Sequence, residues 1–238
     1  MRSSNPVFRT LERSETYAST EAATYRGIVG KTLTLLLLAV ASGYYAITFL
    51  PLESIYGILI GSMIIAFIAV IVSSRSPRLA MPFSIIYALA EGVLLGVITV
   101  IINSYFPGVA LAAIIGTASI FTVMLFLYSS RTIRVTNRFR KIMYSVLLAF
   151  LVFFIIFGIL GVFTTITFNA PIALGVTGIL IIFGALMLAL DFDRAEMIVE
   201  NGADKSYEWI VAVGLMVTIV WIYIELLRFL AIFASSRR

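Results

Sequence analysis

Four acidic residues lie inside or at the ends of long apolar runs, where a charge is costly. Asp191 and Asp193 stand where the run 172–190 gives way to the charged segment "DFDRAEMIVENG", and Glu91 and Glu225 lie deep within two other runs. A carboxylate in hydrocarbon must be protonated, paired with a cation or exposed to a water-filled cavity, so such residues often mark ion or proton pathways. Carboxylate oxygens are also ligands that suit Ca²⁺. These four positions are therefore candidates for an ion path or gate.

The elements that hold them are expected to be membrane-spanning helices. The chain has 238 residues, of which 61% are hydrophobic and 12% charged, and its mean hydropathy is +1.09. The apolar runs are continuous and about twenty residues long, as a helix that crosses a bilayer needs, and they lack the alternation of barrel strands. The sequence predicts an all-α polytopic membrane protein of about seven spans, at 29–50, 55–72, 80–102, 109–128, 143–165, 172–190 and 209–233.

Basic residues predict the orientation of these spans. Lys and Arg occur in the N-terminal segment and in every second connection, which by the positive-inside rule places the N-terminus in the cytoplasm. The basic connections are 72–78, 129–141 and 191–208, and those without Lys or Arg are 51–54, 103–108 and 165–171. The net charge of +5 favours contact with anionic lipids of the cytoplasmic face of a plasma membrane. Arg237 and Arg238 break the pattern, so the last span either crosses, as we expect, or re-enters.

The domain plan is simple. Residues 1–28 are mixed in charge and rich in Ser and Thr, which predicts a flexible cytoplasmic tail rather than a cleaved signal peptide. Residues 29–233 form one membrane domain, and residues 234–238 form a short basic tail.

Several chemistries are excluded or disfavoured. The chain has no Cys and no His, which removes disulfides, thiol catalysis and imidazole metal sites, and leaves carboxylates as the sensors of pH near neutrality. An EF-hand loop fails because Ala195 and Glu196 stand at its fifth and sixth positions, and Asp193, Glu196 and Glu200 instead predict a solvated acidic helix face. No phosphate-binding loop, nucleic-acid motif or catalytic set is present, so we expect neither an enzyme nor a resident cofactor. Ca²⁺, bound at Asp191 or transported, is the expected ion.

Other polar residues and glycines within the spans carry local predictions. Glu225 and Arg228 are spaced to pair on one helix face, together with Thr218 and Trp221. Glu91 either hydrogen-bonds a neighbouring helix as a structural acid or faces a wet cavity. The pairs Gly92–Gly96 and Gly57–Gly61 predict close helix contacts.

The segments "LDFDRAEMIVENG", "YEWIVAVGLMVTIVWIYIELLRFLA" and "TYRGIVGKTLTLLLLAVASG" resemble the Bax inhibitor-1 (transmembrane Bax inhibitor motif) family, in its bacterial branch. The resemblance covers most of residues 24–233. It implies six helices around a central seventh and a calcium leak gated by pH. It also implies an aspartate pair shared by the sixth and seventh helices, latched by an arginine at the end of the second.

Residue by residue, Asp191 matches the aspartate of the sixth helix. Arg75 is the implied latch, with Arg78 as the alternative. The partner in the seventh helix is either Thr218 or Glu225, depending on the alignment. Counting residues from a turn at 201–206, the residue of the seventh helix at the same height as Asp191 is near Met216, which favours Thr218 as the partner.

The sequence therefore predicts a pH-sensitive cation leak, gated by carboxylates near the cytoplasmic side. The alternative is a non-conducting regulatory protein that binds other membrane proteins, such as a membrane-bound protease. A conduit requires Glu91, Asp191 and Glu225 to face one connected cavity, whereas a binding protein can leave these acids paired and dry.

Overall fold

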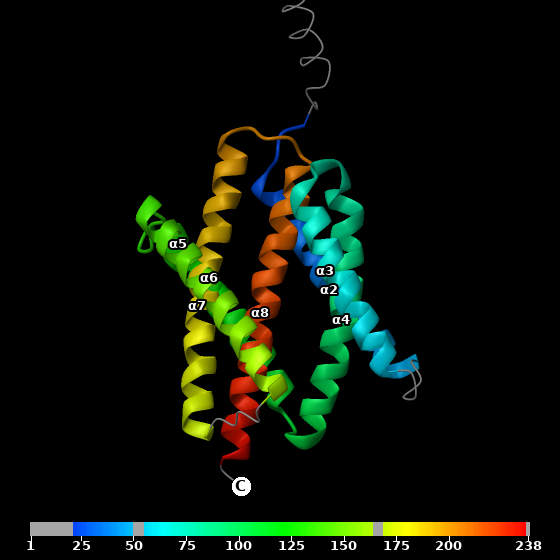
Figure 1. Ribbon diagram of the computed structural model, residues 1–238. Coiled ribbons are helices and arrows are strands. Elements are labelled where there is room, and N and C mark those ends of the chain that lie inside the picture. Colours follow the sequence, from blue (N-terminus) through cyan, green and yellow to red (C-terminus); the bar gives the residue numbers. More distant parts are fainter. Residues whose placement is uncertain (1–20, 50–54, 164–168, 237–238) are drawn as a thin grey trace, which may run out of the picture.

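The computed structural model describes residues 21–49, 55–163 and 169–236, and within them the chain forms seven helices (Figure 1). All seven are long and apolar enough to cross a membrane, which confirms the predicted all-α polytopic fold. Residues 1–20 of the predicted tail, and Arg237 and Arg238, lie outside the described residues. The helices are α2 (Tyr25–Phe49), α3 (Ile55–Arg75), α4 (Pro77–Tyr105), α5 (Val109–Ser129), α6 (Asn137–Phe163), α7 (Ala170–Glu200) and α8 (Tyr207–Ser235).

The last helix is the centre of the bundle. α8 contacts α2, α3, α4, α5 and α7, and in its most apolar stretch 56% of the residues are buried. The corresponding fraction for α6 is 6%, and α6 joins the bundle through a cluster that includes Met143, Phe183 and Trp221. Large apolar side chains elsewhere point outward, as lipid allows and water would not. The predicted central seventh helix is therefore present, with α6 at the periphery.

Glycines bring α2 and α4 into close contact. A Cβ on Gly43 would lie 2.7 Å from the carbonyl oxygen of Gly92, and a Cβ on Gly96 would lie 2.7 Å from the Cα of Gly43. Only glycine permits this approach of two backbones, so the predicted contact at Gly92–Gly96 is confirmed. The same prediction was wrong for Gly57 and Gly61, where an added Cβ would meet no atom within 4 Å.

The hairpin of α7 and α8 positions the candidate gate. α7 continues to Glu200, ten residues beyond the predicted span, and Asn201 caps it before Gly202 turns the chain at φ 61. The chain before α2 pairs with this turn, since the amide of Ala23 donates to the carbonyl of Ala203 at 2.8 Å. α2 itself begins at Tyr25, inside the predicted tail, because its first turn is held against the start of α8.

Candidate functional site

Asp191 lies on the buried face between α7 and α8. The hydroxyl of Thr218 donates a hydrogen bond of 2.6 Å to Oδ2 of Asp191, and the two residues are 9% and 8% exposed. Gly214, one turn before Thr218, also lies beside the carboxylate, since a Cβ there would be in van der Waals contact with Oδ1 at 3.9 Å. Thr218 of α8 thus hydrogen-bonds Asp191, and it lies two positions from Met216, the residue expected at this height from the turn.

Asp191 has no basic side chain within ion-pair distance among the described residues. Arg194, exposed one turn further along α7, interacts with it electrostatically. Asp193 does not join Asp191, because Nη2 of Arg140 at the start of α6 binds its Oδ2 at 2.6 Å. A buried carboxylate with a single neutral donor is poorly compensated, and it gains strongly from a proton or a cation.

Glu225 occupies a second poorly compensated position, deeper on α8. Arg228 donates to its Oε1 at 3.3 Å, which confirms the predicted pair. Its Oε2 is buried and has no hydrogen-bond partner among the described residues, and the same holds for Nε1 of Trp221 one turn earlier. Glu225 follows Thr218 by seven residues, so it lies about 10 Å further along the helix axis and forms no contact pair with Asp191.

Glu91 lies in the middle of α4 and is partly exposed. Its spacing from Ala88 and Ser84 places it on the α4 face that packs against α3, where Ser84 and Ser73 share a hydrogen bond of 2.7 Å. In the described part of the chain, Glu91 makes neither a hydrogen bond nor an ion pair.

Arg75 and Arg78 lie at the same end of the bundle as the α7–α8 turn. Together with Asp204, Ser206 and Tyr207 they line a cavity of about 510 Å³. Asp191 is ten residues before Asn201, about 15 Å deeper along the axis of α7. The ion pairs of the described residues include none between either arginine and Asp191. The arginine latch stays a prediction.

Two residues of the acidic face of α7 beyond the apolar run are paired, so the prediction of a solvated face was wrong for Asp193 and Glu196, whereas Glu200 is exposed as predicted. Tyr128 and Arg131, at the end of α5, both donate to the carboxylate of Glu196, and Asp193 is held by Arg140. The hydrogen bond with Glu196 raises the pKa of the Arg131 guanidinium above its ordinary value. The connection from α5 to α6 folds onto α7, a tertiary contact that helical spacing within α7 does not reveal.

Glu208 is a buried charge that the sequence reasoning missed. It is 1% exposed in the first turn of α8, where it accepts hydrogen bonds from the amide of Thr24 at 2.7 Å and from Nζ of Lys31 at 2.5 Å. A Cβ on Gly27 would overlap its carboxylate. The lysine inside the first apolar run was the available signal, because a buried Lys requires a carboxylate partner. This pair fixes α2 to α8.

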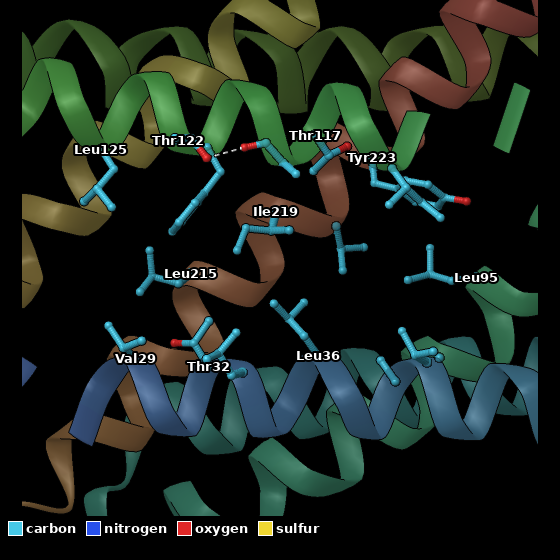
Figure 2. A pocket seen from close by; sticks show the side chains of 18 of the residues that line it. Val29, Thr32, Leu36, Leu95, Thr117, Thr122, Leu125, Leu215, Ile219 and Tyr223 are labelled. Atoms are coloured by element: carbon cyan, nitrogen blue, oxygen red, sulfur yellow. Dashed lines mark hydrogen bonds between the residues drawn. The ribbon is translucent and has the colours of Figure 1, made fainter. Parts of the chain in front are cut away.

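A large apolar groove of about 940 Å³ opens between α2 and α5, with α8 as its floor (Figure 2). Leu36 of α2, Leu125 of α5 and Ile219 of α8 are among its walls. Neither Glu91, Asp191 nor Glu225 lines it. The described residues also contain no group of three or more acidic side chains that could hold a metal ion.

The family-model comparison gives a match to "Bax inhibitor 1 like" over residues 5–235. The chain belongs to the Bax inhibitor 1 like family. A search of curated proteins found no match. The family match covers all seven helices, so it includes both the Asp191–Thr218 contact and the groove.

Within this Bax inhibitor 1 like chain, the paired-acid arrangement implied by the resemblance has one acid and one hydroxyl. The resemblance assigns the sixth-helix aspartate to Asp191, and in the structure Thr218 of α8 donates a hydrogen bond to this residue. A hydroxyl is neutral and can donate or accept a hydrogen bond, so the Asp191 site titrates as one carboxyl group and not as a coupled pair.

Proposed function

We propose that the protein is a pH-sensitive cation leak of the Bax inhibitor 1 like family, with Asp191 as its gate. The observation that carries the proposal is the burial of this carboxylate in a membrane-spanning helix pair, where Thr218 is its hydrogen-bond donor. A buried charge of this kind is expensive to maintain, and in membrane proteins it usually belongs to an ion or proton pathway.

The chemistry follows from the two states of the carboxyl group. When ionised, Asp191 accepts a hydrogen bond from the Thr218 hydroxyl and attracts a cation. Its carboxylate oxygens are ligands that suit Ca²⁺. When protonated, it has lost the charge that attracts the ion. Glu225, whose buried Oε2 has no hydrogen-bond partner among the described residues, would be a second cation-binding position along α8. The leak therefore responds to pH without any histidine.

The latch is the finer part of the proposal. A closed state would bring Arg75, or Arg78 in its place, from the end of α3 toward α7, where it would neutralise Asp191. Protonation of Asp191 would weaken that contact. Arg75→Ala should then raise the resting leak, with Arg78→Ala as the comparison at the same cavity.

The test compares two aspartates on one helix. We expect Asp191→Asn to change the resting cation flux of the purified protein in liposomes and to abolish its pH response. Asp193→Asn should do less, because Asp193 is paired with Arg140 at the helix end. If Asp193→Asn is the stronger lesion, or if Asp191→Asn keeps the pH response, Asp191 is not the gate.

A second candidate function is a non-conducting regulatory protein that binds other membrane proteins, for example a membrane-bound protease. One observation favours it: the large groove is lined by none of the three deep acids, so they do not share that cavity. Absence of flux for the wild-type protein at every pH would select this alternative.

The proposal includes a setting. We infer a bacterial-branch protein of the plasma membrane, with its N-terminus in the cytoplasm and its basic connections against anionic lipid headgroups. The alternation of Lys and Arg between connections supports this orientation. We infer no enzymatic activity and no resident cofactor, since the candidate residues form a buried polar contact and not a catalytic set.

A further inference from the structure

The groove between α2 and α5 is a feature that the proposed leak does not use. In Figure 2, α2 and α5 form its two walls, and α8 lies between them as the floor. Val29, Leu36, Leu125, Leu215 and Ile219 present aliphatic side chains to it. Its volume of about 940 Å³ lies at the upper end of the range of roughly 300–1,000 Å³ that is usual for ligand sites.

Five of the hydroxyl groups that line the groove are already hydrogen-bonded within the protein. Thr32, Thr117 and Thr122 donate to the carbonyls of Ile28, Ala113 and Ala118, one turn earlier in their own helices. Thr99 and Tyr223 share a hydrogen bond of 2.8 Å with each other. The groove therefore offers methyl and methylene surface over most of its length, which suits an apolar occupant and not a hydrated ion.

One end of the groove is polar. Tyr25, Tyr128, Ser129, Arg131 and Glu196 line it, at the end of the bundle where α2 begins and α5 ends. The Arg131 side chain is 61% exposed, and Glu196 occupies two of its five N–H donors. A cation with free donors, next to tyrosines at the level of the membrane surface, matches a lipid phosphate.

We infer that the groove binds one glycerophospholipid of the leaflet that contains Arg131, with an acyl chain on α8 and the phosphate at Arg131. The groove is long enough for an acyl chain, because the α5 residues that line it run from Ile114 to Ser129, about 22 Å along the helix. This inference does not depend on the leak, since none of the deep acids lines the groove.

The shape of the groove favours a flexible chain over a transmembrane helix. Helices that associate in membranes approach through small residues. The small residues Gly43, Gly92 and Gly96 of α2 and α4 also line the groove, but they already pack against each other. Elsewhere the walls carry bulky side chains such as Leu36 and Phe121, and an acyl chain that bends between them fills this uneven space better than a rigid helix.

The test uses a phosphatidylglycerol with a photoactivatable diazirine in its acyl chain, in phosphatidylcholine vesicles that contain the full-length protein. Mass spectrometry then locates the labelled residues. We expect labels on α2, α5 and α8 inside the groove, and a several-fold loss in Ala118→Trp, which fills the groove. Ala112→Trp is the matched control, because Ala112 is also exposed on α5 but does not line the groove.

A second arm tests the phosphate. The same diazirine chain on diacylglycerol has no phosphate, so Arg131→Ala should lower phosphatidylglycerol labelling toward the diacylglycerol level. Arg134→Ala, an exposed arginine of the same connection outside the groove, should not. Equal labelling in Ala118→Trp and Ala112→Trp, or labelling confined to the outer faces of the helices, would overturn the lipid site. An Arg131→Ala protein that labels like the wild type would overturn the headgroup assignment.

Discussion

Replacing Thr218 with valine isolates the hydrogen bond that holds the Asp191 carboxylate. Valine keeps the shape of threonine and removes the hydroxyl that donates to Oδ2 at 2.6 Å. A hydrogen bond to a charged group contributes about 1.5–3 kcal/mol. The loss falls mainly on the ionised form of Asp191, because a hydroxyl donates a stronger hydrogen bond to a carboxylate than to a neutral carboxyl group.

The sign and size of the effect follow. Weaker stabilisation of the ionised form means that Asp191 takes up its proton at a higher pH. At 1.36 kcal/mol per pH unit, the loss of about 1.5–3 kcal/mol moves the midpoint of the pH response upward by roughly one to two units. The assay is cation flux from liposomes that contain the purified protein, measured across a pH series.

Thr177→Val is the control for this experiment. Thr177 is a buried threonine of α7, 3% exposed, whose hydroxyl bonds to backbone carbonyls of its own helix. Its removal should leave the midpoint in place. A Thr218→Val protein with the wild-type midpoint, or a midpoint moved to lower pH, would refute the account of Asp191 as the titrating gate.

Three further predictions concern the rest of the chain. If Glu91, partly exposed in mid-span, faces a wet cavity, Glu91→Gln should alter cation flux with little loss of folded protein; unchanged flux would make it a structural acid. Gly27→Ala should lower the midpoint of thermal unfolding, at a cost of about 1–3 kcal/mol, because its Cβ overlaps the Glu208 carboxylate. Gly30→Ala, where an added Cβ meets no atom within 4 Å, should not. A cysteine at Thr136 should react with an impermeant thiol reagent only after the membrane is opened, and labelling of intact cells would reverse the orientation.

The sequence predicted the helices well because length and hydropathy suffice to define a membrane span. It also predicted the Glu225–Arg228 pair, which depends on spacing within one helix. The predicted α8 residue opposite Asp191, Met216, is two positions from the observed partner Thr218. The prediction was this close because the short turn at 201–206 fixes how the two helices of the hairpin align.

Contacts between distant segments were not predictable in the same way. Arg131 reaches α7 from the connection that follows α5, and Arg140 reaches it from the first turn of α6. Lys31 reaches Glu208 across most of the chain. Each of these pairs depends on how whole helices pack, which a single sequence does not specify. The same limit explains the error at Gly57 and Gly61, since small-residue spacing permits a close contact but does not require one.

The most direct test of the central claim is calcium flux through the wild-type protein alone. The purified chain is placed in liposomes that enclose a calcium indicator, at a series of pH values and beside protein-free liposomes. The account predicts a calcium leak that depends on the protein and changes with pH across the titration of one carboxyl group. A flux equal to that of protein-free liposomes at every pH would contradict it.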